Sequence, residues 1–320
     1  MTRLGYQIPN FTYPDTTPRQ LFGTVVAQAK AAEEAGFDRV MLMDHFYQLP
    51  TLGAPEEPMF ECYAMLAALA QHTASVRLSA LVTGNTYRNP ALLAKQVTTL
   101  DHVSHGRAAL AIGAAWFELE HTSLGFEFGT LSDRFEKLEE ALRIVIPMLR
   151  SERVTFTGRH YRADNAINSP PPLSRIPVMI GGSGERKTLR MVAQYADESN
   201  IGGPVSEVPH KLDVLAEHCE RAGRDRSEIA VSKHITCCIA PTREEAERDL
   251  VRMAEIKGWN EARVEIAKTT LVFGDPDSVG EQLASVRAAG VDGFTINLAV
   301  NGHKTERIAL LGEVANKVLG

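Results

Sequence analysis

Residues 176–203 read IPVMIGGSGERKTLRMVAQYADESNIGG. In this segment a proline-led apolar run, Val178–Gly181, precedes a glycine-rich turn, a stretch of helical period and a second short run, Glu198–Ile201. Two strand-like runs on either side of a helix predict a strand–helix–strand unit. In such a unit the two strands are parallel, because the helix carries the chain back to the starting edge of the sheet.

The same alternation of short apolar runs and helical stretches continues through the rest of the chain. Six further strand candidates are Leu4–Ile8, Arg39–Met43, Val76–Thr83, Ala108–Gly113, Ala230–Ile239 and Gly293–Leu298. Eight strands with helices between nearly all of them predict an α/β fold of the (β/α)8 TIM-barrel type. An open doubly wound sheet is the alternative, because periodicity does not distinguish a closed sheet from an open one.

Nothing along the chain marks a second domain, so residues 1–320 are predicted to form one barrel domain. The segment Gly158–Pro172 is the longest region without a clear helix or strand pattern. Long loops in compact domains are usually functional. We therefore expect this segment to be an insertion that lies over the C-terminal face, across the barrel mouth.

Composition restricts the class of partner. Of the 320 residues, 44% are hydrophobic and 23% are charged, which is typical of a globular protein. The net charge of −6 argues against a nucleic acid or an anionic membrane and favours a small-molecule partner. The first residues, MTRLGYQIPNF, lack the pattern of a signal peptide, so a cytoplasmic location is expected. The cysteines show no metal-ligand spacing and are expected to be reduced and structural; they are Cys62, Cys219, Cys237 and Cys238.

In a closed barrel the chemistry belongs to the loops that follow the strands. Asp44 and His45 come directly after the second strand, where an imidazole can transfer a proton near neutral pH. A third strand leads into Gly84–Asn85, either an irregular backbone that approaches a flat ligand or a simple turn. After the fourth strand, Gly113–Ala115 leave room for a ring system, and Trp116 offers either an aromatic wall or core packing.

The glycine-rich turn of the opening segment has the features of an anion site. Backbone N–H groups at the start of a helix bind anions when no side chain crowds them, and Ser183 adds a hydroxyl donor. Arg186 and Arg190 are four residues apart on the following helix, with Lys187 beside them, and could attract an anionic ligand. They could equally form a solvated basic face. The turn is not a dinucleotide-binding fingerprint, because the G-x-G-x-x-G spacing after the first strand is absent.

Several segments together resemble the luciferase-like flavin oxidoreductases, in particular the branch that uses coenzyme F420, a deazaflavin. They are MDHF at 43–46, TYRNP at 86–90, GAAWFELEH at 113–121, SDRFEKLEEALRI at 132–144, IGGSGERKTLRMVAQYAD at 180–197 and FGDPDSVGEQL at 273–283. The resemblance covers nearly the whole chain, and the third and fifth segments are the more specific ones.

The resemblance implies roles for individual residues. Asp44 and His45 would lie against the deazaflavin, with His45 as the proton-transfer residue. A non-proline cis peptide near Leu81–Val82, with Thr83 beside it, would back the ring. The residues implied to flank the ring are Gly113, Ala114 and Trp116, and those implied to hold the phosphate are Gly181, Gly182, Ser183 and Gly184.

The same resemblance implies a function. Hydride would move between C5 of the deazaflavin and a small organic substrate, and the protein would act as a homodimer. A related sugar-phosphate dehydrogenase branch has a glutamate acid where this chain has Trp116, which argues against a sugar-phosphate substrate. A monooxygenase that uses reduced FMN and a catalytically silent flavin-binding protein remain as alternatives on the same scaffold.

Overall fold

A parallel β-sheet forms the centre of the molecule, of which the computed structural model describes residues 3–320. Its strands are Leu4–Ile8 (β1), Arg39–Leu42 (β2), Arg77–Ala80 (β3), Thr83–Gly84 (β4), Leu110–Gly113 (β5), Val178–Gly181 (β8), Glu198–Ile201 (β9), Ala230–Ile239 (β10), Val272–Gly274 (β11) and Gly293–Asn297 (β12). Neighbours pair in the order β3, β2, β1, β12, β10, β9, β8, β5 and β4, while β11 pairs with β10.

The sheet closes on itself between its two ends. β3 and β4 are two parts of one strand, separated by the cis peptide between Leu81 and Val82. β3 pairs with β2 and also bridges β5 through Leu78 and Ala108, and β4 pairs with β5. The predicted barrel is therefore confirmed, and the open doubly wound sheet is not formed.

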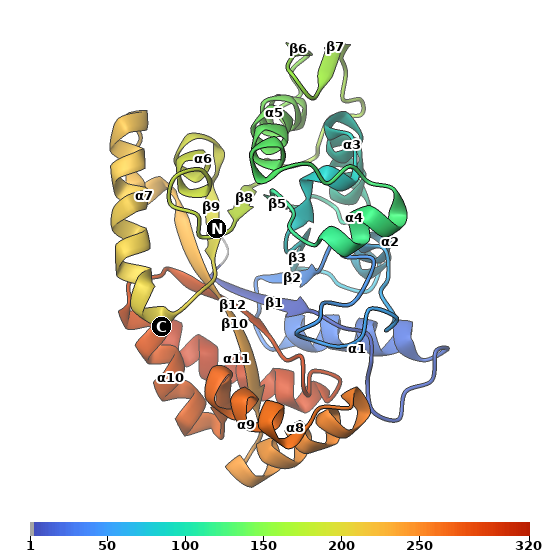
Figure 1. Ribbon diagram of the computed structural model, residues 1–320, viewed down its shortest axis with the longest axis vertical. Helices are drawn as coiled ribbons and strands as arrows, with labels where there is room; N and C mark the ends of the chain where they lie inside the picture. The colour runs from blue at the N-terminus through green and yellow to red at the C-terminus, as the bar shows by residue number, and fades with distance from the viewer. Residues whose placement is uncertain (1–2) are drawn as a thin grey trace.

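Helices cover the outside of the barrel (Figure 1). Those that follow the barrel strands are Leu21–Glu34 (α1), Cys62–Ala70 (α2), Pro90–Val103 (α3), Glu118–Leu124 (α4), Leu131–Leu149 (α5), Thr188–Tyr195 (α6), Val208–Ala222 (α7), Arg243–Lys257 (α8), Glu261–Thr270 (α9), Pro276–Ala288 (α10) and Thr305–Leu319 (α11). Among residues 3–320 no helix is both long and apolar enough to cross a membrane.

The sequence sets helix starts through side-chain caps. Asn89 accepts a hydrogen bond from the backbone N–H of Ala91, and Pro90 occupies the first helical position of α3. Asp275 and Pro276 repeat this arrangement at α10. A capping side chain satisfies a backbone donor that has no partner within the helix, and proline loses nothing at this position.

The main hydrophobic core lies between the strands and the helices. Fully buried side chains from both layers meet there, for example Leu42 and Ile180 from strands and Leu66, Val97 and Leu142 from helices. A smaller cluster packs under α8 and α9. All four cysteines are buried and free, in agreement with the structural role predicted for them.

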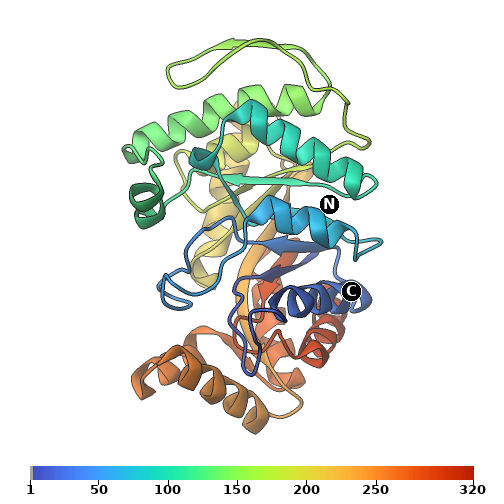
Figure 2. The ribbon, with the colours of Figure 1, turned by 90° about the vertical axis from the view of Figure 1, so that its right-hand side faces the viewer.

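The predicted insertion is not a lid over the barrel mouth. Its first half belongs to a two-stranded hairpin of β6 (Val154–Thr157) and β7 (Arg162–Ala166), which runs along the outer side of α5 (Figure 2). Glu140 on α5 accepts backbone N–H bonds from the hairpin turn, residues 159–161. Lys95 on α3 donates to the carbonyl oxygen of Ser169. These contacts hold the segment against two helices, so the prediction of its position was wrong.

The loop between β2 and α2 does lie beside the barrel mouth. Arg263 on α9 donates to the carbonyl oxygens of Pro50 and Thr51, and Lys257 at the end of α8 forms an ion pair with Glu57. The side chain of Lys257 is almost completely buried. Contacts from α8 and α9 therefore hold in place the β2–α2 loop, which contributes to the functional site.

Candidate active site

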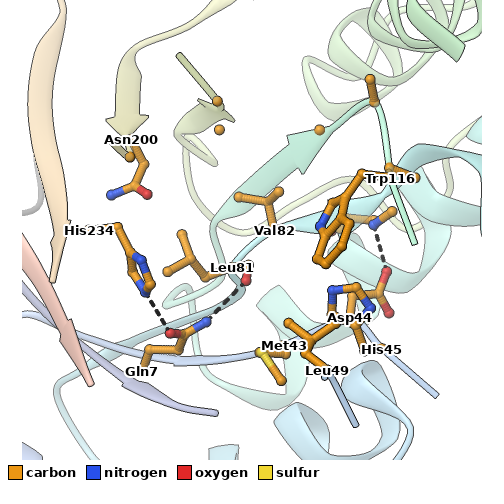
Figure 3. A pocket seen from close by; sticks show the side chains of 18 of the residues that line it. Gln7, Met43, Asp44, His45, Leu49, Leu81, Val82, Trp116, Asn200 and His234 are labelled. Atoms are coloured by element: carbon orange, nitrogen blue, oxygen red, sulfur yellow. Dashed lines mark hydrogen bonds between the residues drawn. The ribbon is translucent and has the colours of Figure 1, made fainter. Parts of the chain in front are cut away.

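A cavity of about 590 Å³ lies at the C-terminal ends of the barrel strands. Most of its wall is apolar, and its volume lies in the range of cofactor and ligand pockets. The predicted residues that line it are Asp44, His45, Leu81, Val82, Thr83, Gly113, Ala114, Trp116, Gly181 and Gly182, whereas Ser183 and Gly184 do not line it. In the view of Figure 3, His45 lies on one side of Leu81 and Val82 and His234 lies on the other.

Asp44 is a buried, fully paired carboxylate. It accepts two hydrogen bonds from Arg88, at 2.5 and 2.9 Å, and one from the backbone N–H of Gly84 at 2.8 Å. Burial opposes the charge of Arg88, but the bonds to Asp44 raise its pKa overall. Asp44 therefore carries no free charge toward a ligand, and it ties the end of β2 to the end of β4.

His45 is held by a glutamate that the sequence analysis missed. Its Nδ1 donates to Oε2 of Glu120 at 2.8 Å, and Glu120 is completely buried. Burial would raise the pKa of Glu120, but hydrogen bonds from His45, Tyr87 and the Tyr47 backbone lower it, so the carboxylate is ionised. An ionised carboxylate only accepts hydrogen bonds, so Nδ1 carries the proton and Nε2 is left as a base.

Two aromatic rings pack beside the imidazole of His45. The ring centroids of Trp116 and Phe117 lie 5.9 and 6.0 Å from that of His45, both in edge-to-face geometry. The side chain of His45 retains 14% exposure at the cavity, while Trp116 is 59% exposed. Trp116 is therefore a wall of the cavity mouth and not core packing.

One feature of the sequence indicates that Glu120 could belong to the site. It lies in the quoted GAAWFELEH segment, on the first turn of α4, a helix that begins just after β5. In this short helix Glu120 and His121 are buried, whereas Glu118 and Leu119 point to solvent. A glutamate on the first turn of α4 can reach back toward the strand ends. Whether Glu118 or Glu120 does so depends on the orientation of the helix, which the sequence does not give.

The cis peptide predicted near Leu81–Val82 is present at that bond. The carbonyl oxygen of Leu81 accepts a hydrogen bond from Nε2 of Gln7 at 3.3 Å. Val82 packs against two glycines: a Cβ on Gly181 would lie 2.7 Å from its Cγ1, and one on Gly113 would lie 2.9 Å from its Cγ2. Both glycines are therefore required by the close approach of Val82, in addition to leaving room in the cavity.

The glycine-rich turn after β8 also differs in detail from the expectation. Gly182 has a φ of +125°, which an L side chain rarely adopts. The hydroxyl of Ser183 donates to the carbonyl oxygen of Gly202 at 3.2 Å and accepts its N–H at 2.9 Å. That hydroxyl is committed to joining two loops. Among the described residues, the backbone N–H groups of Ser183 and Gly184 have no acceptor and remain free for an anion.

The basic residues in α6 and just before it are not equivalent. Arg190 pairs with Glu139 on α5 at 2.7 Å, so the expectation that it attracts a ligand was wrong. Lys187 lies close to the start of α5, where its Nζ donates to the hydroxyl of Ser132. Thr188, which the sequence analysis did not select, lines the cavity from the first turn of α6.

Residues 2–293 match the sequence profile of the luciferase-like monooxygenases. The chain belongs to the luciferase-like monooxygenase family. One relative, the F420-dependent glucose-6-phosphate dehydrogenase of Nakamurella multipartita, is 28% identical over 89% of both chains. Another luciferase-like relative, the FMNH(2)-dependent dimethylsulfone monooxygenase of Pseudomonas fluorescens, is 25% identical over 89% of this chain and 84% of its own.

Solved structures share the luciferase-like barrel. An F420-dependent secondary alcohol dehydrogenase, in complex with an F420–acetone adduct, has a TM-score of 0.79 at 22% identity, with 100% of this chain and 99% of that chain covered. The relatives of this luciferase-like chain are redox enzymes, so the chain is an oxidoreductase and not a catalytically silent binding protein.

Proposed function

We propose that this chain binds coenzyme F420 in the barrel cavity and transfers a hydride between the deazaflavin and a small, neutral organic substrate. The observation that carries the proposal is the His45–Glu120 pair, because a hydride moves to or from a carbon–oxygen bond only when a proton is also exchanged at the oxygen. The second candidate function is that of a monooxygenase that uses reduced FMN, and similarity to the Pseudomonas relative supports it.

The lining of the cavity fits a flat ring with an anionic extension. Leu81 and Val82 would back the ring, and Gly113, Ala114 and Trp116 would flank it. The backbone of Gly181–Gly184 with Thr188, at the start of α6, would hold the phosphate. When bound, the deazaflavin supplies a carbon that gives or accepts a hydride.

His45 supplies the proton transfer in this proposal. In the oxidation of an alcohol, Nε2 of His45 would take the O–H proton, and the electron pair of that O–H bond would form the carbonyl as the hydride leaves the carbon. The imidazolium that results is stabilised by the Glu120 carboxylate on Nδ1. In the opposite direction, His45 returns the proton to the oxygen.

The charges around the cavity favour a neutral substrate. None of the described residues that line it is a lysine or arginine, and Asp44 is neutralised by Arg88. A phosphate group on the substrate would be buried without a cation, which is costly. The lining thus favours a substrate other than the glucose 6-phosphate in the name of the Nakamurella relative.

A binding titration tests the cofactor. We expect coenzyme F420 to bind at least about tenfold more tightly than FMN, a difference of roughly 1.4 kcal/mol. The affinity is measured from the fluorescence of each cofactor during titration with purified protein. Reduction of F420 is then followed by its absorbance after addition of propan-2-ol or, in a separate sample, glucose 6-phosphate. Tighter binding of FMN would favour the monooxygenase. Reduction of F420 by glucose 6-phosphate but not by propan-2-ol would refute the proposal of a neutral substrate.

A further inference from the structure

A second histidine, His234, faces the cavity from the other side of Leu81 and Val82. His234 on β10 lies in a polar cluster with Gln7 on β1 and Asn297 on β12, and all three line the cavity. Figure 3 shows His234 next to Gln7. Nε2 of His234 is 2.9 Å from Oε1 of Gln7, and Nδ2 of Asn297 donates to the same oxygen at 3.1 Å. The proposed proton transfer at His45 does not use this cluster.

The hydrogen bonds determine which nitrogen of His234 carries the proton. The carbonyl oxygen of Leu81 can only accept, so the Gln7 atom that faces it is the Nε2 donor. The other atom of that amide is then the oxygen, which also can only accept. Nδ2 of Asn297 also lies 3.1 Å from Nε2 of His234, but its two hydrogens have acceptors in Oε1 of Gln7 and Oγ1 of Thr236, at 3.1 and 3.3 Å. The shorter contact, 2.9 Å between Nε2 of His234 and Oε1 of Gln7, needs a hydrogen on Nε2, so Nδ1 of the neutral ring holds a free lone pair.

The surroundings keep this ring neutral. Burial, with a smaller contribution from the neighbouring Lys233, lowers the pKa of His234 to about 4. The two side chains next to Nε2 of the ring, Gln7 and Asn297, are uncharged. At neutral pH the ring is thus an uncharged group with a fixed donor side and a fixed acceptor side.

Nδ1 is left without a partner in the described part of the chain. No hydrogen bond within residues 3–320 ends on this nitrogen, and it is not among the buried unpaired polar atoms, so it is open to the cavity. In the same polar cluster, Oδ1 of Asn297 is a buried acceptor that has no donor among the described residues. Once a ligand fills the cavity and excludes water from Nδ1, this acceptor is left unsatisfied unless the ligand brings a donor.

We propose that His234 is a specificity-determining residue whose Nδ1 accepts a hydrogen bond from a neutral O–H or N–H group of the ligand in the cavity. The choice of ligands rests on the proposed function, since the donor comes either from the substrate hydroxyl or from an N–H of the cofactor ring. A cationic donor is disfavoured because Asp44, the one carboxylate among the described lining residues, is paired with Arg88, and because Lys233 is close to His234.

Nitrogen NMR of the wild-type protein, labelled with ¹⁵N at histidine, tests the proposal directly. The His234 signals are assigned by their loss in His234→Asn. In the free protein between pH 6 and 8 we expect a protonated Nε2 and an unprotonated Nδ1. The Nδ1 signal should shift when F420 is added if the donor is the ring, or only when propan-2-ol follows if the donor is the alcohol.

A pair of variants separates the two sides of the ring. His234→Asn keeps an acceptor near the position of Nδ1 but loses the donor to Gln7, whereas His234→Gln keeps that donor and loses the acceptor. The dissociation constant or KM of the probe that shifts Nδ1 should rise about tenfold more in the Gln variant than in the Asn variant. Thermal unfolding of both variants monitors folding.

The outcomes distinguish this inference from the proposed function. Absence of F420 binding in the fluorescence titration would refute the proposed cofactor, and the NMR series is then run with FMN. Cofactor binding with no Nδ1 shift in either step, or a protonated Nδ1 in the free protein, would overturn the role of His234. Equal effects of the Asn and Gln variants would overturn it as well.

Discussion

Nδ1 of His45 lies 2.8 Å from Oε2 of Glu120, although 75 positions separate the two residues in the chain. Glu120 also accepts hydrogen bonds from the Tyr87 hydroxyl and from the Tyr47 backbone. A buried carboxylate fixed by several donors has one orientation, and it passes that orientation to the imidazole. Glu120 is therefore a positioning residue for His45.

Replacement of Glu120 by glutamine should lower kcat for hydride transfer by about 10- to 100-fold. The amide keeps the size of the side chain but removes the charge that stabilises the imidazolium of His45. F420 affinity should change by less than about threefold, because Glu120 does not line the cavity. Single-turnover kinetics give the rate, Glu120→Asp tests rescue by a shorter carboxylate, and an unchanged rate in Glu120→Gln would reject the positioning role.

Acid stability provides a second test of the same residue. The folded protein lowers the pKa of Glu120 below its ordinary value of 4.5, because the donors around it outweigh burial. Its contribution to stability is therefore complete above about pH 4.5 and is lost as the pH falls through the lower, folded-state pKa. The Tm should fall less steeply below pH 4.5 in Glu120→Gln than in the wild type. Parallel Tm curves would indicate that other carboxylates account for the acid sensitivity.

His45→Ala should reduce turnover by roughly 10²- to 10⁴-fold, the usual range for a general acid or base, with little change in F420 affinity. The reason is that Nε2 is the basic atom left at the cavity once Nδ1 is bound to Glu120. Thermal midpoint and single-turnover hydride transfer should be measured on the same preparation. A variant that is less stable but turns over normally per folded molecule would remove His45 from the chemistry.

The barrel was predictable because its signals are local. Strand candidates such as Arg39–Met43 and Glu198–Ile201 differ from the observed strands by at most one residue, since apolar runs between caps and glycines have clear limits. Val76–Thr83 was predicted as one strand because its apolar pattern is continuous across the break at Leu81–Val82. The resemblance to the family, not the pattern, indicated the cis bond there.

The partners of the site residues were not predictable from local pattern. Glu120 meets His45, and Gln7 meets His234 across 227 positions, only after the barrel has closed. Arg190 likewise has the spacing of an anion-binding residue, but Glu139 on a neighbouring helix occupies it. Sequence pattern places a residue at a strand end, whereas tertiary contacts decide whether its charge is free.

The anion site at the glycine-rich turn is tested by Gly184→Asp against Gly184→Asn. A Cβ at this position would lie 3.0 Å from Oγ1 of Thr188, so both variants perturb the turn equally, and only one adds a negative charge at the start of α6. We expect the dissociation constant for F420 to rise more than about tenfold in the Asp variant relative to the Asn variant. Equal affinities in the two variants would move the phosphate away from this turn.

The ion pair of Lys257 with Glu57 should link the stability of α8 to the position of the β2–α2 loop beside the cavity. Glu57→Gln leaves the buried ammonium of Lys257 without its anion, which should cost about 3–5 kcal/mol of unfolding free energy. Lys257→Met in the same chain removes that unpaired charge, so the double variant should be more stable than Glu57→Gln alone. Urea unfolding of the four proteins in the cycle measures the coupling.

Leu49, Thr51 and Leu52 of this loop line the cavity, so the KM of the substrate should rise in Glu57→Gln and recover in part in the double variant. Strictly additive losses of stability would show that the two charges do not depend on each other.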